Sequence, residues 1–127
     1  MRVLARVYSQ HEFSDLNDFF AKNGLPIFKS MPERITWSDP VTEEQEQYKI
    51  DEQWFLPRSD LAKSKMFYVI QKFRTDEGGR IRIGYYKIGE RPRFKGKWAW
   101  GESCPWYRYE DLGSLLPLLK SLAQETD

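Results

Sequence analysis

The chain has little cysteine and histidine: one of each, Cys104 and His11, occurs in 127 residues. A single cysteine cannot form an internal disulfide, and this usage is typical of a reducing compartment. Structural zinc sites draw their four ligands mainly from cysteine and histidine, so zinc would have to recruit carboxylates here. We therefore expect a cytoplasmic protein with no bound metal and no cofactor, stabilised by its hydrophobic core.

Long apolar runs are also missing from the sequence. The first residues, MRVLARVYSQHEF, are interrupted by Arg6 and do not contain the apolar stretch of a secretory signal peptide. No segment approaches the roughly 20 apolar residues that cross a bilayer as a helix. The sequence thus predicts a protein that does not associate with membranes.

Motifs for catalysis are absent as well. There is no GxxxxGK[ST] pattern for binding phosphates. Cys104 and His11 could pair as nucleophile and base, but a lone cysteine is more often an inert buried residue. Carboxylates at positions 39, 43, 44 and 46 could serve a metal nuclease, but a run of charges is usually a solvated face. We predict a protein that is not an enzyme.

The charges are unevenly distributed along the chain. The overall net charge of +1 conceals an acidic segment 1–57 with 6 basic and 10 acidic residues, a net of −4. Segment 58–109 has 13 basic and 5 acidic residues, a net of +8, and segment 110–127 has 1 and 4, a net of −3. A basic middle segment of this kind favours an anionic partner.

The first half of the chain predicts a strand, a helix and an irregular segment. Residues 2–8 alternate between apolar and polar positions, as a strand does. Ser9 and Glu12 have the spacing of a capping box, and a phenylalanine and leucine stripe follows, which predicts a helix over 10–23. Prolines interrupt 25–60, where Asp39 and Pro40 indicate the start of a short acidic helix over 41–50.

The second half predicts a three-stranded meander and a closing helix. The β-branched and aromatic segments 66–75, 80–88 and 93–100 are expected to be strands, with a turn at 76–79. Leucine spacing predicts a helix over 115–124, with Ser114 as its N-cap. The expected fold is α+β: an antiparallel sheet, formed by the N-terminal strand and the meander, packed on one face by an N-terminal and a C-terminal helix. Residues 1–127 would form one domain. It would consist of a strand and a helix in 1–24, a segment interrupted by prolines in 25–60, and the meander with its closing helix in 61–127.

Alternation along the three predicted strands separates an apolar face from a basic one. Phe94, Trp98 and Trp100 are expected in the core. On the opposite face we expect a nucleic-acid-binding surface formed by Tyr68, Lys72, Arg74, Arg80, Arg82, Tyr86, Arg93, Lys95 and Lys97. Cations would neutralise phosphates and tyrosines would stack on bases, which favours single-stranded DNA or RNA.

The order GRIRIGYYKIGERPRFKGKWAW, then DLGSLLPLLKSL, resembles the positive-cofactor-four family of single-strand-binding transcriptional coactivators and the related Pur-type domains. The resemblance covers residues 66–124 and implies single-strand binding on the basic sheet face and homodimerisation. The alternative is a protein-interaction module or inhibitor with an unidentified protein partner. Such a module would use the aromatic turn of Trp106, Tyr107 and Tyr109, or the acidic helix 41–50, because tryptophan and tyrosine dominate interface hot spots.

Overall fold

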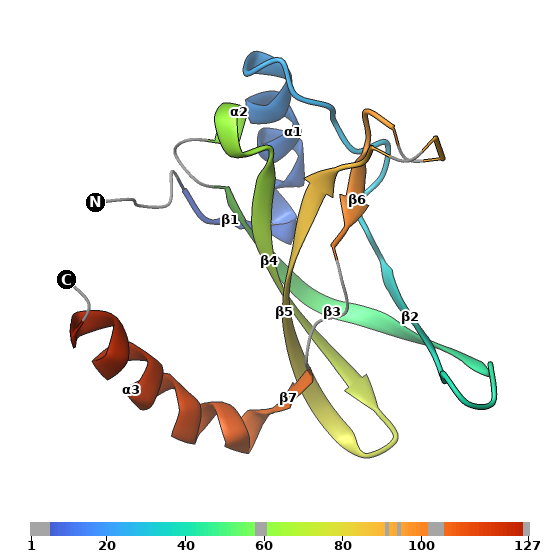
Figure 1. Cartoon of the computed structure of the whole chain (residues 1–127), viewed down its shortest axis with the longest axis vertical. Coiled ribbons are helices and arrows are strands. Elements are labelled where there is room, and N and C mark those ends of the chain that lie inside the picture. The colour runs from blue at the N-terminus through green and yellow to red at the C-terminus, as the bar shows by residue number, and fades with distance from the viewer. Residues whose placement is uncertain (1–5, 58–60, 91, 94, 102–105, 126–127) are drawn as a thin grey trace.

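A computed structural model of the chain describes residues 6–57, 61–90, 92–93, 95–101 and 106–125. Within these residues the predicted α+β class is confirmed, with a mostly antiparallel sheet packed against helices (Figure 1). The elements in chain order are β1 (Tyr8–Ser9), a 3-10 turn (Gln10–Glu12), α1 (Phe13–Lys22), β2 (Arg34–Ser38), β3 (Gln45–Pro57), α2 (Leu61–Ser64), β4 (Met66–Thr75), β5 (Gly78–Ile88), β6 (Trp98–Trp100), β7 (Trp106–Arg108) and α3 (Tyr109–Glu125).

The N-terminal elements follow the sequence signals closely. The backbone N–H of Ser9 donates to the Glu12 carboxylate, and the Ser9 side chain accepts from the backbone N–H of Glu12, which completes the predicted capping box. The helix ends at Lys22, and Gly24 has a positive φ of 69°, a conformation that favours glycine. Residues 2–5 of the predicted first strand lie outside the described residues.

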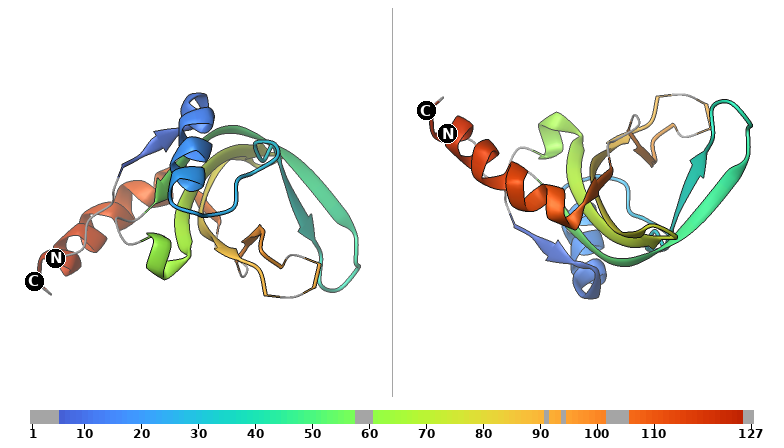
Figure 2. Two further views of the ribbon diagram at one scale, coloured as in Figure 1. Left: turned by 90° about the horizontal axis from the view of Figure 1, so that it is seen from above. Right: turned by 90° about the horizontal axis from the view of Figure 1, so that it is seen from below.

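The sheet has long central strands, and two short strands pair with only part of β3 and of β5. Strands follow the order β1-β3-β4-β5-β6, while β2 pairs with the first part of β3 and β7 pairs with the first part of β5. The sheet is strongly curved (Figure 2). We call the face that carries Phe55, Phe67, Val69 and Phe73 the inner face, and the opposite one the outer face.

The helix α1 fills one end of the inner face. Leu16 and Phe20 are completely buried against Phe55, Phe67 and Trp98, and the Trp98 indole N–H donates to the Pro26 carbonyl at 2.6 Å. The core position predicted for Trp98 is therefore correct, and Trp100 is half-buried against the same cluster. Phe94 lies outside the described residues. At the other end of the sheet a smaller cluster forms around Ile35, Ile50 and Phe73.

Strand β3 runs through both ends of the sheet and contains a β-bulge between them. The register with β4 shifts between Ile50 and Glu52, so that one residue is inserted. Even-numbered residues up to Ile50 and odd-numbered residues from Gln53 onward therefore share the inner face. The bulge lets one long strand serve both hydrophobic clusters.

The predicted acidic helix 41–50 is wrong. The Asp39 carboxylate accepts hydrogen bonds from the N–H groups of Val41 and Thr42, as an N-cap would, but the chain turns and enters β3 at Gln45. The alternation of Tyr48 and Ile50 toward the core gives this segment the period of a strand, and β2 supplies its partner. The proline-punctuated segment therefore contains a β-hairpin.

The predicted third strand 93–100 is mostly loop. Only Trp98–Trp100 form β6, because Gly96 has a φ of 72° and donates its N–H to the Gly89 carbonyl, which closes the chain into a loop. Pro92, Arg93, Lys95 and Lys97 are all exposed. Gly96 therefore belongs to the loop that precedes the short strand.

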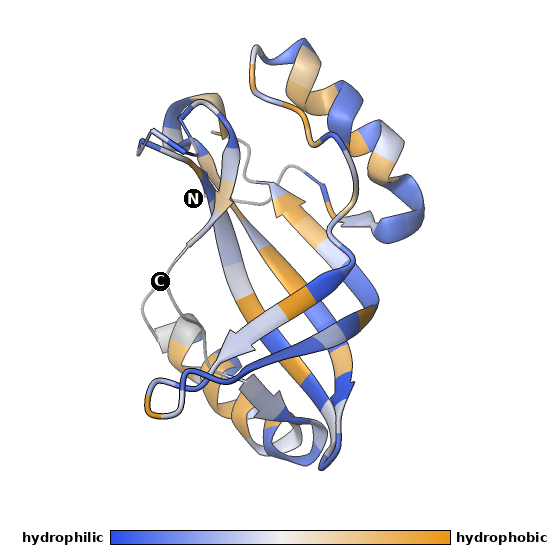
Figure 3. Ribbon diagram, turned by 90° about the vertical axis from the view of Figure 1, so that its right-hand side faces the viewer, coloured by the Kyte–Doolittle hydropathy of each residue, from blue (hydrophilic) through white to orange (hydrophobic). Residues whose placement is uncertain are grey.

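The C-terminal helix begins earlier than predicted. It includes Pro117 in its interior, where the ring removes the hydrogen bond to the carbonyl four residues back. It contacts β5 and β7 near its start and then extends away from the sheet (Figures 1 and 2). Hydrophobic positions recur along it (Figure 3), and four of its leucines remain about half exposed: Leu116, Leu118, Leu119 and Leu122.

Candidate nucleic-acid interface

The outer face of β3, β4 and β5 carries aromatic, aliphatic and basic side chains together. Register pairing places these residues on it: Glu52, Trp54, Leu56, Met66, Tyr68, Ile70, Lys72, Arg74, Ile81, Ile83, Tyr85 and Lys87. The one carboxylate among them, Glu52, lies opposite Lys72. Tyr68 remains 42% exposed and Ile83 39% exposed. These two exposed side chains are diagonal neighbours on paired strands, which makes the outer face the candidate binding surface.

The predicted basic face is divided between three places. Tyr68, Lys72 and Arg74 lie on the outer face, as predicted for them. Arg80, Arg82 and Tyr86 face Phe73, Gln71 and Phe67 across β4 and β5, and so lie on the inner face. The prediction that all nine residues share one surface is therefore wrong, since Arg93, Lys95 and Lys97 stand in the exposed loop before β6.

The β4–β5 turn is the physical reason for this division. Thr75 pairs with Gly78, so the turn has two residues, Asp76 and Glu77, and Gly78 adopts a φ of 115°. A turn with an even number of residues places odd-numbered residues of β4 opposite even-numbered residues of β5. Ile81 and Ile83 consequently point outward, and the arginines between them point inward.

Arg82 is half-buried and donates to a buried polar chain formed by Gln71 and Gln53. Its Nε donates to Gln71 Oε1 at 2.6 Å, Gln71 Nε2 donates to Gln53 Oε1 at 3.1 Å, and Gln53 Nε2 donates to the Pro32 carbonyl at 2.6 Å. The guanidinium also lies over the Trp100 ring, 3.8 Å from its centroid. Arg82 is thus part of the internal structure, and Trp100 is half-buried beneath it.

Tyr86 is also an interior residue. Its ring packs against Phe67 and Phe28, and burial raises the pKa of its hydroxyl to about 12, although the positive charge of Arg82 opposes that rise. The hydroxyl therefore stays protonated at neutral pH. Tyr86 presents no ring for a base to stack on.

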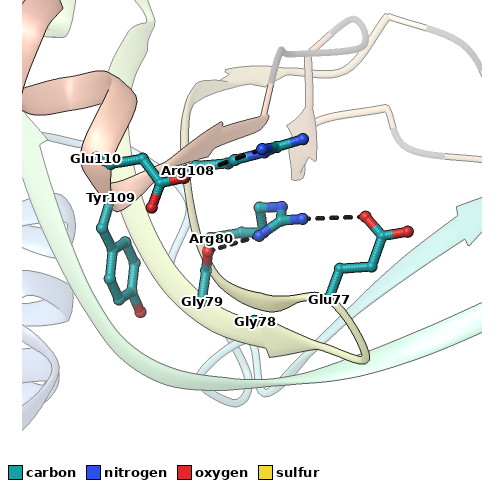
Figure 4. A pocket seen from close by; sticks show the side chains of 7 residues that line it. All are labelled: Glu77, Gly78, Gly79, Arg80, Arg108, Tyr109 and Glu110. Carbon is teal, nitrogen blue, oxygen red and sulfur yellow. Dashed lines mark hydrogen bonds and ion pairs between the residues drawn. The ribbon is translucent and has the colours of Figure 1, made fainter.

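Arg80 and Arg108 are cross-strand partners beside the start of α3. They line a cavity of about 340 Å³ together with Glu77, Gly79, Tyr109 and Glu110 (Figure 4). Arg80 pairs with Glu77 at 3.3 Å and Arg108 pairs with Glu110 at 3.9 Å. Each cation thus has its own carboxylate partner within this cavity.

The aromatic residues of the alternative interaction site do not form a turn. Trp106 and Tyr107 are in β7, where Trp106 packs on the inner face against Phe73 and Tyr107 pairs with Ile81 on the outer face. Tyr109 begins α3, and its ring lies over Gly79 and 5.5 Å from Lys72 Nζ. Two of the three aromatics therefore border the outer face, while Trp106 belongs to the inner one.

Several outer-face residues were not among the predicted site residues: Trp54, Leu56, Ile70, Ile81, Ile83, Tyr85 and Lys87. Two signals could have found them. The first is the even number of residues in the β4–β5 turn, which fixes which residues of β5 share a face with those of β4. The second is the alternation of 45–57, which is typical of a strand once the acidic residues at its start are passed.

The described residues contain no group of three or more His, Cys, Asp or Glu side chains arranged to hold a metal ion. Among the same residues, no helix has both the length and the apolar character required to span a bilayer. The weighed pairing of Cys104 with His11 falls on Cys104, which lies outside the described residues. Comparison of the chain with protein-family models, curated proteins and solved structures finds no match.

Proposed function

We propose that this is a non-enzymatic, cytoplasmic protein that binds single-stranded nucleic acid on the outer face of β3, β4 and β5. The observation that carries the proposal is the exposure of Tyr68 between the cations Lys72, Arg74 and Lys87 on one sheet face. A phosphate backbone lying across this face would displace counterions from those cations. Exposed bases would stack on tyrosine or pack against the isoleucines.

Single strands fit this surface better than a duplex. Major-groove readout needs an inserted helix or a two-stranded ribbon, whereas the outer face is formed by a broad central part of the sheet (Figure 2). Single-stranded bases are unstacked and can lie flat against side chains. Trp54 and Tyr85 enlarge the aromatic area on either side of β4.

The test is a salt series of binding to a fluorescent single-stranded oligonucleotide. We expect log affinity to fall linearly with log salt concentration. The double variant Lys72→Ala/Arg74→Ala should reduce the magnitude of that slope by about 1.4, because about 0.7 counterions are released per neutralised phosphate of a single strand. Binding at low salt should weaken in parallel, with the fold unchanged because both side chains lie at the surface.

The matched control is Lys95→Ala/Lys97→Ala, which removes the same charge from the loop before β6. It should leave the slope closer to that of the unmodified chain. Equal effects of the two double variants would show that net charge, and not the outer face, governs binding. Binding that ignores salt, or no binding at low salt, would contradict the proposal and favour a protein partner for this surface.

A further inference from the structure

A second surface lies on the inner face, at the end of the sheet that α1 does not cover. Trp37 of β2, Tyr48 of β3 and Trp106 of β7 line a cavity of about 280 Å³. The Trp106 ring meets Trp37 at 58° with centroids 6.4 Å apart, and meets Tyr48 at 89° with centroids 5.8 Å apart. We call these three rings the aromatic cage.

The cage is held in place from behind. Trp106 packs edge-to-face on the fully buried Phe73 at 5.0 Å, and Tyr48 lies 5.8 Å from the same ring. Trp37, by contrast, stands at the edge of the sheet and remains 38% exposed. Two walls are therefore fixed by the core, and the third is open to an incoming group.

Carboxylates surround the cage. Glu46, Asp76 and Glu77 line the same cavity with one cation, Arg80, so the formal charge of the lining is three negative and one positive, a net of −2. Arg80 is itself paired with Glu77. The hydroxyl of Tyr48 donates to Glu46, and this hydrogen bond raises the pKa of Tyr48 to about 12, so the ring stays neutral at physiological pH.

We propose that the aromatic cage and its carboxylates bind an N-methylated ammonium group. Ring faces attract a cation placed within about 6 Å of their centroids, and such cages are a recognised means of holding quaternary ammonium. The negative lining disfavours phosphate, which separates this surface from the proposed nucleic-acid interface. Methylation suits the cage because it spreads the charge and adds apolar surface, whereas an unmodified ammonium is compact and strongly hydrated.

Two sources could present this group: a small trimethylammonium compound, or a trimethyllysine side chain of a protein. The first test titrates the protein with choline, and in parallel with its neutral isostere 3,3-dimethylbutan-1-ol, following tryptophan fluorescence and the indole N–H signals of Trp37 and Trp106. We expect saturable binding of choline that is at least about tenfold tighter than that of the isostere. A second arm compares a short peptide containing trimethyllysine with the same peptide carrying unmodified lysine.

The informative variant is Trp37→Ala, because this ring is exposed and its loss should leave the core intact. It should weaken choline binding at least about tenfold, and Glu46→Gln should weaken it without changing the shape of the site. Trp54→Ala, which removes a tryptophan from the outer face, should leave choline binding unchanged. Tighter binding of the trimethyllysine peptide than of choline would identify a methylated protein as the source, and equal binding would indicate a small molecule.

The inference is overturned if the neutral isostere binds as well as choline, if none of the probes binds saturably, or if Trp37→Ala leaves binding unchanged. It is independent of nucleic-acid binding. Trp37→Ala should not alter the salt slope for the oligonucleotide, and Lys72→Ala/Arg74→Ala should not alter choline binding. Failure of one function therefore leaves the other testable.

Discussion

Replacing Phe67 with alanine is expected to lower the free energy of unfolding by about 3–5 kcal/mol. The Phe67 side chain is completely buried, and its ring centroid lies 4.9–6.3 Å from those of five others: Phe20, Phe28, Phe55, Tyr86 and Trp98. These rings come from α1, the following loop, β3, β5 and β6. Truncation would leave a cavity that elements from so many parts of the chain cannot collapse to fill.

The neighbouring residue supplies the control. Tyr68 lies on the outer face and is 42% exposed, so Tyr68→Ala should cost less than about 1 kcal/mol of stability. It should instead weaken oligonucleotide binding by about 1–3 kcal/mol, the contribution of one base stacked on an aromatic ring. Urea unfolding gives the stabilities, and a constant m-value would show that the variants change stability alone. Similar stability losses for both variants would contradict the assignment of the two faces.

The element types near the termini and in the central hairpin could be predicted because their signals are local. The capping box of Ser9 and Glu12, and the run 66–88 with its turn, depend on residues close together in the chain. Strand β3 was missed for a different reason. Glu43, Glu44 and Glu46 suggest the first turn of a helix, and the alternation typical of a strand becomes clear only beyond them.

The side-chain faces could not be assigned from hydropathy, and the candidate site depended on them. Ile81 and Ile83 look like core residues and Arg82 looks like a surface residue, but the two-residue turn fixes the opposite arrangement. An arginine can occupy an interior position when acceptors and a ring receive it, and the chain provides Gln71 and Trp100 far from it in sequence. Such partners are invisible to a periodic pattern. The same holds for the aromatic cage, whose three rings come from separate strands.

Replacing Gln71 with leucine is expected to destabilise the protein by about 2–6 kcal/mol, although leucine is more apolar and similar in size. Gln71 is fully buried, accepts from Arg82 and donates to Gln53, which is 1% exposed. Leucine would leave one acceptor of Gln53 and one donor of Arg82 unsatisfied, and each such group costs about 1–3 kcal/mol. The measurement is urea unfolding at neutral pH.

A double-mutant cycle with Arg82→Met separates this cause from a packing defect. If the hydrogen bond carries the effect, the double variant should be less destabilised than the sum of the two single variants by about 1–3 kcal/mol, because methionine leaves no donor to satisfy. Gln53→Leu combined with Gln71→Leu should show coupling of the same sign, since both ends of their shared hydrogen bond are removed. Additive losses in both cycles would mean that shape alone holds Gln71 in place. In that case the inward position of Arg82 would rest on the hairpin register and its contact with Trp100, and not on the buried polar chain.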